Sequence, residues 1–459
     1  MQRKNGLEVR VSAWNLKAAE RNESAREETL AAKQPNVVLI VVDTLRLDRA
    51  APLARTLAGF VDYGYAVTPA PWTLPAHVSM LTGLYPSIHE SHERADMKTM
   101  VDFARIRNDN STLMTRLKKM GYSTYGYSAN NFISTAFGFD GFDVLKNWEV
   151  PWHELLFKMD PVSKWKISKF IRTRNLRDLV SPLLHVLRVN PKLFFSTVFT
   201  TIGIGIERVF WRWPVNKGLR NATNFVKRTK FKEPFFLFLN ILEVHNPYYK
   251  NDRLLEAGFA VRSTSTISKE ELQMWTSGYD NQVEQVAQKL PKLFNSLAEK
   301  GLLDNSLVIL TSDHGQLLGE HGWIGHGVFL YDELVQVPLL VKYPALAENI
   351  SPRRGQISLA NIPNFILDLA EGRNTDASLF SNQVFSESFL SLPKTQGRRI
   401  CVFTDEGKVT YKLDSNEVEE AIINGNVDVS AVKAQLVEKC IKFAGLNENL
   451  LASKMSTNH

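Results

Sequence analysis

Residues 35–46 read PNVVLIVVDTLR, and this stretch carries the main indication of the fold. Its unbroken run of β-branched and aliphatic residues is typical of a strand that is buried on both faces of a parallel sheet. Similar apolar runs occur at 234–245, 307–315 and 337–344, with helical patterns between them. Strands that alternate with helices predict an α/β fold, with a mostly parallel sheet flanked by helices on both faces.

The segments between these strands have recognisable patterns of their own. We expect helices at 73–82 and 111–120 and a short strand at 122–129. A long amphipathic helix is expected at 270–300. Pro291 would bend or divide that helix, because proline has no backbone N–H to continue the hydrogen-bond ladder.

The C-terminal part of the chain changes to short, partly alternating strands, followed by an amphipathic helix at 431–445. This change predicts a small α+β subdomain at 376–459, after a catalytic domain at 35–375. The N-terminal residues 1–34 are expected to form a polar extension.

Length and composition limit the classes of protein that the chain can belong to. With 459 residues, 44% of them hydrophobic and 22% charged, the chain is expected to be globular, with one large domain and a smaller one. Its two cysteines, Cys401 and Cys440, are too few for a disulfide framework and fit a reducing compartment. The sequence shows no signal peptide and no conventional transmembrane helix, so we expect a cytoplasmic protein.

The excess positive charge is confined to one segment of the chain. Between residues 158 and 232 there are 17 basic and three acidic residues, a net charge of +14, whereas the rest of the chain carries −7. The same segment holds an uncharged apolar run at 193–206 and the aromatic and basic WRWPVNK at 211–217. We interpret about 150–232 as an inserted helical segment. Two alternatives stay open for it: its apolar face packs on the core, or it makes a peripheral contact with an anionic membrane.

Nucleic acid is not an expected partner, because no recognition motif accompanies the basic charge. The candidate chemistry lies instead at strand ends, since ligands of parallel α/β sheets bind outside the carboxyl ends of the strands. One buried strand ends at Asp43 and another at Asp313, which His314 follows directly. Carboxylate and imidazole groups suit a divalent cation such as Zn²⁺ or Mn²⁺. Further candidates near strand ends or in a glycine-rich loop are His245, His321 and His326.

The stretch APWTLPAHVSMLTG at 70–83 opens a helix with Thr73, Pro75 and His77. One interpretation is ordinary helix punctuation, because threonine can cap a helix and proline is favoured in its first turn. The other is chemical, because a helix N-terminus attracts anions and a hydroxyl there can face an anionic substrate. This stretch alone leaves both open.

Together these motifs resemble the sulfatase branch of the alkaline phosphatase superfamily. The resemblance implies an alkaline-phosphatase-like core with a C-terminal subdomain, and a metal-dependent nucleophile that attacks phosphorus or sulfur. The motifs that carry it, in chain order, are VVDTLR (41–46), PWTLPAHVSMLTGLYP (71–86), EVHNPY (243–248), YDNQVEQVAQKL (279–290), SDHGQLLGEHG…GHG (312–327) and YDELVQVPLLV (331–341).

The resemblance also implies roles for individual residues. It places the metal ligands at Asp43, Asp313 and His314 and the nucleophile at Thr73. The cofactor would be one or two divalent ions of Zn, Mn, Ca or Mg. His245 and His326 fall where relatives contact the anionic oxygens of the substrate or, in some phosphotransferases, a second metal.

Three other residues are weaker substrate-binding candidates. His77 falls where true sulfatases place the arginine of Cys-x-Pro-x-Arg, and a role in helix packing is an equal alternative for it. Asn130 belongs to YSANN at 127–131, in the region where many sulfatases have a lysine-bearing motif that is not recognisable here. His321 lies in the glycine-rich loop.

Two departures from the family concern the chemistry. Thr44 stands where many sulfatases have a second aspartate, and Thr73 is neither the cysteine nor the serine that can become formylglycine. A formylglycine hydrate expels its sulfuryl group by collapsing to the aldehyde, and a threonine ester has no such exit. A phosphothreonine, in contrast, can be attacked at phosphorus by water or by an alcohol.

Thr73 therefore favours phosphate esters, above all phosphodiesters, hydrolysed or transferred by a metal-dependent enzyme. Lipoteichoic acid synthases and phosphoethanolamine transferases similarly use threonine, generally on lipid headgroups. The expected substrate is an anionic ester, of a lipid headgroup or of a glycan. The alternatives are a sulfatase that works without formylglycine and, in another class, a catalytically silent, membrane-associated binding protein.

Overall fold

The computed structural model describes most of the chain between residues 34 and 456. Nearly all of the extension expected at 1–34 and most of the insertion expected at about 150–232 lie outside the described residues. Of the insertion, short pieces between residues 184 and 198 and the segment from residue 216 are described. The other described ranges are 34–57, 59–92, 112–147, 216–249, 261–345, 355–373, 375–389, 397–425 and 427–456.

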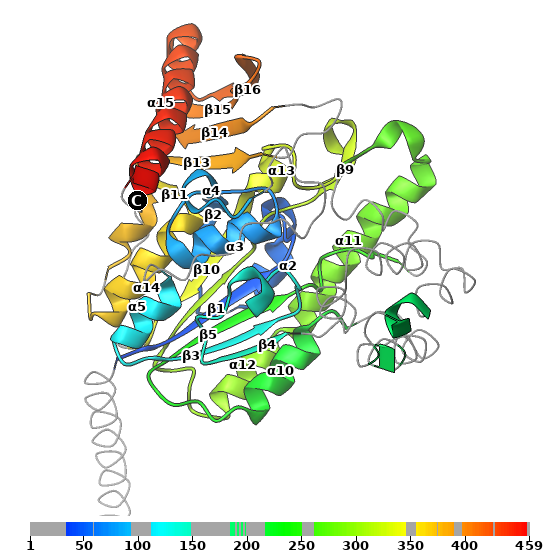
Figure 1. Cartoon of the computed structure of the whole chain (residues 1–459), viewed down its shortest axis with the longest axis vertical. Coiled ribbons are helices and arrows are strands. Elements are labelled where there is room, and N and C mark those ends of the chain that lie inside the picture. Colours follow the sequence, from blue (N-terminus) through cyan, green and yellow to red (C-terminus); the bar gives the residue numbers. More distant parts are fainter. Residues whose placement is uncertain are drawn as a thin grey trace, which may run out of the picture.

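A seven-stranded sheet forms the centre of the described structure (Figure 1). Its order is β2 (Val61–Val67), β10 (Gln336–Lys342), β7 (Ser306–Thr311), β1 (Asn36–Val42), β5 (Phe235–Ile241), β3 (Ser123–Ser128) and β4 (Val144–Asn147). Neighbours pair in parallel from β4 through β3, β5 and β1 to β7, whereas β10 runs antiparallel to both β7 and β2. The mostly parallel sheet expected from the sequence is confirmed.

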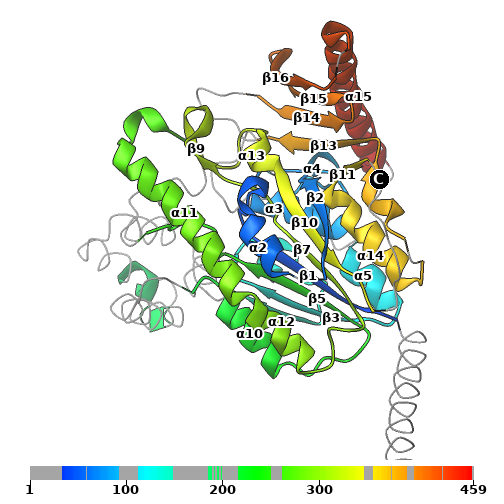
Figure 2. The same cartoon turned by 180° about the vertical axis from the view of Figure 1, so that it is seen from behind.

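Helices cover both faces of this sheet (Figures 1 and 2). Side chains of α2, α10, α11 and α12 pack on one face, and those of α3, α5 and α14 on the other. Because successive residues of a strand point to opposite faces, Val38 and Ile40 of β1 join the first group while Val37 and Leu39 join the second. This explains the unbroken apolar run of β1. The helices are α2 (Ala51–Thr56), α3 (Thr73–Thr82), α5 (Leu113–Lys119), α10 (Leu219–Arg228), α11 (Lys269–Lys289), α12 (Pro291–Ala298) and α14 (Ile362–Ala370).

Two strands of the sheet depart from the regular alternation of strand and helix. The strand expected at 337–344 is present as β10, which follows the short α13 (Asp332–Val335) and runs antiparallel to both of its neighbours. The strand β2 was not predicted from the sequence. This edge strand alternates between partly buried and exposed residues and contains Asp62 and Gly64, which are disfavoured in strands.

The helix expected at 270–300 is divided, as the proline in it predicted. The helix α11 ends at Lys289, and Pro291 is the first residue of α12, where its missing N–H costs nothing. At the other end of α11 a capping box holds the first turn, since Ser268 and Glu271 each accept from the other's backbone N–H.

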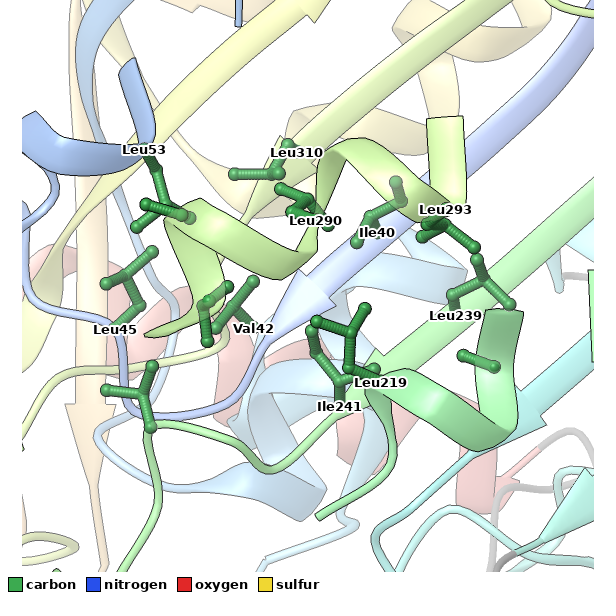
Figure 3. Close-up of a cluster of buried hydrophobic side chains, with 14 of the residues drawn as sticks. Ile40, Val42, Leu45, Leu53, Leu219, Leu239, Ile241, Leu290, Leu293 and Leu310 are labelled. Atoms are coloured by element: carbon green, nitrogen blue, oxygen red, sulfur yellow. The ribbon is translucent and has the colours of Figure 1, made fainter. Parts of the chain in front are cut away.

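We expect Leu290→Ala to lower the free energy of unfolding by about 2–5 kcal/mol. Leu290 lies at the junction of α11 and α12, fully buried, in the apolar cluster that contains Ile40 and Leu310 (Figure 3). Truncation removes buried methyl groups and leaves a cavity against the sheet. Urea unfolding measures the change. The exposed neighbour Lys289 supplies the control, because Lys289→Ala should change stability by less than about 0.5 kcal/mol.

A second, four-stranded sheet with a long helix forms the C-terminal part (Figure 1). The strands pair antiparallel throughout, and side chains of the helix such as Leu436 and Phe443 pack against Ile400 and Val409 of the sheet. The α+β character expected for this region is confirmed, with a helix longer than the expected 431–445. In order, the elements are β13 (Gln383–Ser388), β14 (Arg399–Thr404), β15 (Gly407–Lys412), β16 (Glu417–Ile423) and α15 (Val429–Ser456).

This C-terminal part contacts the main sheet region directly. Tyr85, which precedes α4 (Pro86–His89), packs edge-on against Phe443 of α15 at 5.1 Å between ring centroids, and Glu387 N donates to Pro69 O. Both cysteines are buried and free. Among the described residues, no helix, α15 included, combines the length and the apolar character needed to cross a membrane.

Candidate active site

Two adjacent parallel strands bring three candidate metal ligands together. Asp43 directly follows β1, and Asp313 and His314 follow β7, so all three lie at the same edge of the sheet. One ligand atom from each residue lies within 4.8 Å of those of the other two, and all three side chains are fully buried. The convergence expected from the sequence is therefore present.

Each of the two carboxylates has one oxygen held by the protein and one without a hydrogen bond. Asp43 Oδ2 accepts from Asn130 Nδ2 at 2.9 Å, and Asp313 Oδ1 accepts from the backbone N–H groups of Thr44 and His314 at 3.2 and 3.0 Å. Asp43 Oδ1 and Asp313 Oδ2 accept no hydrogen bond from any described residue. A buried carboxylate oxygen without a partner is costly, so two of them beside an imidazole fit a divalent cation.

Burial changes the titration of this cluster. It raises the pKa of Asp43 to about 6, with a second contribution from the nearby Asp313 charge. It likewise raises the pKa of Asp313 to about 7. Burial lowers the pKa of His314, which favours the neutral imidazole. A cation would offset the cost of both buried carboxylates.

The imidazole of His314 is oriented by the backbone. Its Nδ1 lies 2.9 Å from Gly315 O and must donate there, since a carbonyl oxygen only accepts. In the neutral ring, Nε2 then carries the lone pair. This atom lies 3.5 Å from Asp313 Oδ2 and 3.4 Å from Thr73 Oγ1, so the lone pair is available at the cluster.

Thr73 is the first residue of α3 and is almost completely buried. Its hydroxyl does not cap the helix: Oγ1 lies 3.4 Å from both His314 Nε2 and Asn130 Nδ2. The preceding residue, Trp72, offers no side-chain acceptor to the helix N–H groups. Of the two interpretations of 70–83, the geometry therefore favours a hydroxyl at the positive end of a helix, facing the carboxylates.

Two more of the expected histidines lie beside this cluster. The His326 ring is 4.4 Å from that of His314 and 5.6 Å from that of His245, between centroids. His326 Nδ1 lies 2.6 Å from Gln316 Oε1, and His245 Nδ1 lies 3.0 Å from Asn246 O. In each ring Nδ1 therefore donates a hydrogen bond, and Nε2 of the neutral imidazole is available to accept a proton. Burial lowers the pKa of both imidazoles.

A small sheet supports the loop that carries His326. Two short strands within residues 317–325 pair antiparallel, and a third short strand, at 262–263, pairs antiparallel with the second of them. Arg46 holds the start of this loop from the β1 side, because its guanidinium donates to Gln316 O and Glu320 Oε1. The strands are β6 (Arg262–Ser263), β8 (Leu317–Leu318) and β9 (Trp323–Gly325).

The three weaker candidates occupy different places. Asn130 joins the cluster, bridging Asp43 and Thr73. His77 is fully buried behind Thr73: its Nδ1 lies 2.9 Å from Thr73 O, and its ring packs edge-on against Phe238. Burial lowers the pKa of His77 to about 3, so its imidazole is neutral.

His321 lies in a different environment, on the short 3-10 helix η6 (Glu320–Gly322). Its Nε2 is 3.3 Å from the Glu333 carboxylate, and its ring stacks on Tyr331 at 3.8 Å between centroids. Within the described part of the chain, its hydrogen bonds and ring contacts do not join it to the aspartate cluster.

Several residues of the site carried no clear signal in the sequence. Gln316 follows Asp313 by three positions, yet only the fold shows that it orients His326. Thr44 has a left-handed backbone (φ 62°), which is strained for a β-branched residue and costs about 1–3 kcal/mol. Its hydroxyl donates to Asp43 O, so it does not replace the aspartate that many sulfatases have there.

We expect Asn130→Ala to weaken binding of a divalent cation by about 10- to 100-fold, because it removes the hydrogen bond that orients Asp43. Isothermal titration of Mn²⁺ or Zn²⁺ into the metal-free protein measures the affinity. The adjacent Asn131→Ala is the matched control and should bind as wild type does. Equal affinities of the two variants would contradict the assigned role of Asn130.

The chain is similar to known proteins over most of its length. A family model described as Sulfatase matches residues 35–372. An arylsulfatase of Clostridium perfringens is 23% identical over 358 residues, covering 68% of this chain and 69% of the relative. Among solved structures, a 2-O GAG sulfatase superposes with a TM-score of 0.59 at 14% identity, covering 92% of this chain and 93% of the other. A phosphonate monoester hydrolase of Silicibacter pomeroyi has a TM-score of 0.56 at 17% identity, with 90% and 96% covered.

Proposed function

Because the chain belongs to the sulfatase family, we propose that it is an ester hydrolase or transferase that acts on phosphate esters, above all phosphodiesters, with Thr73 as its nucleophile. The observation that carries this proposal is the position of Thr73 Oγ1, 3.4 Å from both His314 Nε2 and Asn130 Nδ2 and beside two carboxylates. Threonine cannot become formylglycine, so the nucleophile must act as an alcohol. A phosphate ester of an alcohol can be resolved by a second attack at phosphorus.

Members of this family use a divalent metal, and Asp43, Asp313 and His314 would hold it here. Such a cation lowers the pKa of a nearby hydroxyl and neutralises negative charge on the transferring group. Zn, Mn, Ca and Mg all remain candidates, although two carboxylates with one imidazole nitrogen suit Zn²⁺ or Mn²⁺ best.

The chain's own groups account for the remaining steps. Thr73 Oγ1 loses its proton to water and bonds to phosphorus. The bond between phosphorus and the leaving oxygen breaks on the opposite side, and its electron pair stays with that oxygen. Nε2 of one imidazole of the His245–His326 pair, protonated from solvent, gives a proton to the leaving oxygen. The uncapped N-terminus of α3 stabilises the charge that develops on the phosphoryl oxygens.

In the second half of the reaction, water or an acceptor alcohol attacks the phosphothreonine. The same histidine pair takes the proton of the attacking oxygen. The bond between phosphorus and Thr73 Oγ1 then breaks, and that oxygen recovers a proton, which regenerates the hydroxyl.

A sulfatase that works without formylglycine is the second candidate, and its support is about as strong. It rests on the Sulfatase family match and on the arylsulfatase of Clostridium perfringens. In that case the same cluster would bind a sulfate ester, of a glycan for example. The catalytically silent binding protein is disfavoured, because the buried carboxylates, imidazole and hydroxyl are all retained in one place.

Paired assays separate these candidates. Wild type and Thr73→Val are compared on bis(p-nitrophenyl) phosphate, p-nitrophenyl phosphate and p-nitrophenyl sulfate, each with added Mn²⁺ or Zn²⁺. Turnover of the phosphate esters that depends on Thr73 supports the proposal. Turnover of the sulfate alone contradicts it in favour of the sulfatase. Activity that Thr73→Val leaves unchanged would remove Thr73 from the chemistry.

We also propose that the segment 158–232 contacts an anionic membrane. Its net charge of +14 supports this, as do exposed apolar side chains in its described pieces, at Leu184 and Phe195, which are 52% and 61% exposed. Co-sedimentation with vesicles that contain phosphatidylglycerol tests the contact. Leu184→Ser with Phe195→Ser should reduce binding, whereas Met274→Ser, at an exposed position of α11, should not. Binding that the double substitution leaves intact would contradict the proposal.

A further inference from the structure

Lys217 is a buried lysine whose ammonium group binds the backbone of a single loop. The residue as a whole is 5% exposed. Nζ donates to the backbone carbonyls of Glu243 (3.4 Å), His245 and Pro247 (2.8 Å), and to Gln282 Oε1 at 2.8 Å. A buried ammonium is costly unless all its N–H groups are satisfied, and here carbonyl dipoles surround it. The arrangement therefore fixes the positions of three carbonyls within five residues.

Gln282 and Glu243 make further hydrogen bonds in this arrangement. Gln282 of α11 donates from Nε2 to Pro247 O at 2.7 Å, so it bonds both the ammonium and the loop. Glu243 Oε1 accepts from the backbone N–H groups of Lys217 and Leu219 at 3.1 and 2.7 Å. Hydrogen bonds from the Lys217 ammonium and from the backbone N–H groups of Lys217 and Leu219 thus connect this segment to the loop at 243–247.

The residue between these donors has to be glycine. Gly218 has φ +131°, and a Cβ there would lie 2.6 Å from the Ala129 Cβ. The chain can therefore bring Lys217 against the loop and begin α10 at Leu219 only with this backbone. The same five-residue loop carries His245, whose ring reaches towards His326.

From these contacts we propose that Lys217 is a positioning residue for His245: its ammonium, with Gln282, holds the loop 243–247 so that the imidazole faces the aspartate cluster. The inference rests on the proposed function, in which His245 belongs to the proton-carrying pair. Lys217 acts through His245 and does not touch the substrate. Lys217→Met removes the charge and keeps the length, so we expect a loss of kcat/KM of about 10- to 100-fold, as for a catalytic group displaced by about 1 Å.

A double-mutant cycle with His245→Ala separates positioning from a general structural effect. If Lys217 acts only through His245, Lys217→Met lowers kcat/KM strongly in the wild-type background and by less than about 3-fold in the His245→Ala background. Equal losses in the two backgrounds would overturn the proposal. The cycle is measured on whichever ester the wild type turns over, so it remains valid if the phosphodiester proposal fails and the substrate is a sulfate.

Hydrogen exchange supplies a readout that needs no activity. We expect Lys217→Met to increase deuterium uptake of the backbone amides in 242–249 at least several-fold, with unchanged uptake in β1 and β7. The matched control is Lys342→Met. That half-buried lysine also donates to backbone carbonyls, of Leu303 and Tyr343, at the end of β10 opposite the site. Unchanged exchange in 242–249 would overturn the proposal whatever the enzyme's substrate.

A second variant keeps the test available if Lys217→Met does not fold. Gln282→Met leaves the ammonium in place and removes one of its acceptors together with the bond to Pro247 O. It should give a smaller change of the same kind, an intermediate loss of kcat/KM that disappears in the His245→Ala background. Gln282→Met with wild-type exchange and activity would count against the proposal.

Discussion

Thr73→Val should lower kcat by about 10³- to 10⁶-fold, the range for loss of a nucleophile. Valine keeps the shape of threonine and replaces only the hydroxyl, so the buried first turn of α3 should pack as before. This hydroxyl lies 3.4 Å from both His314 Nε2 and Asn130 Nδ2. Among the described residues, no other hydroxyl group makes a hydrogen bond with either of these two nitrogen atoms. Steady-state kinetics on the active substrate measures the loss.

Thr73→Ser is the matched control, because it removes the methyl group and keeps the hydroxyl. It should retain turnover within about 10- to 100-fold of wild type, since only the orientation of the oxygen is loosened. Mass spectrometry of the wild type quenched during turnover of a phosphate ester should show a phosphoryl group on the peptide that contains Thr73. A Thr73→Val enzyme that turns over at the wild-type rate would exclude the nucleophile assignment.

Adding Mn²⁺ or Zn²⁺ should stabilise the metal-free protein, and more strongly at pH 7.5 than at pH 5. Burial raises the pKa of Asp43 to about 6 and that of Asp313 to about 7, from 3.8 in the unfolded chain. Burial lowers the pKa of several histidines, His77, His245, His314 and His326 among them, and these groups contribute in the opposite sense. Between about pH 4 and pH 7 the two carboxyl groups bind more protons in the folded, metal-free protein than in the unfolded chain. Their contribution to the free energy of unfolding therefore falls as the pH rises through this range.

Cation binding reverses this trend, because it needs the deprotonated carboxylates. At a concentration about 1,000 times its dissociation constant, the cation adds about 4 kcal/mol to the free energy of unfolding. Calorimetry at both pH values, with EDTA and with the cation, measures the effect. An identical shift at pH 5 and pH 7.5 would be inconsistent with carboxylate ligands.

Asp313→Asn tests whether the carboxylate of Asp313 binds the cation. It keeps the shape of the side chain and removes one buried charge, so the metal-free variant should be more stable at pH 7.5 than the metal-free wild type. It should also lose the cation-dependent shift and the activity. The control is Asp280→Asn on α11, an exposed carboxylate paired with Arg49, which should leave both unchanged. A variant at residue 313 that keeps the full shift would remove this residue from the cation site.

The sequence predicted the central part of the site because of how parallel sheets are built. Asp43 and Asp313 each follow an apolar strand run, and carboxyl ends of parallel strands share one edge, so their proximity could be inferred without coordinates. The family resemblance placed Thr73 in the same site. The edge strand β2 was missed, because a strand with one solvent-facing side and an internal Asp and Gly lacks the apolar run that indicates a strand.

The sequence by itself thus determined which residue types meet at the strand ends, and that residue 73, a threonine, cannot become formylglycine. Only the tertiary structure decided how they are supported: that Thr73 faces His314 instead of capping α3, that Gln316 orients His326, and that Lys217 binds the His245 loop. The reason is physical. Strand-end position follows from local hydrophobic pattern, whereas these hydrogen bonds join residues brought together by packing, and nothing in the pattern distinguishes Lys217 from the sixteen other basic residues between 158 and 232.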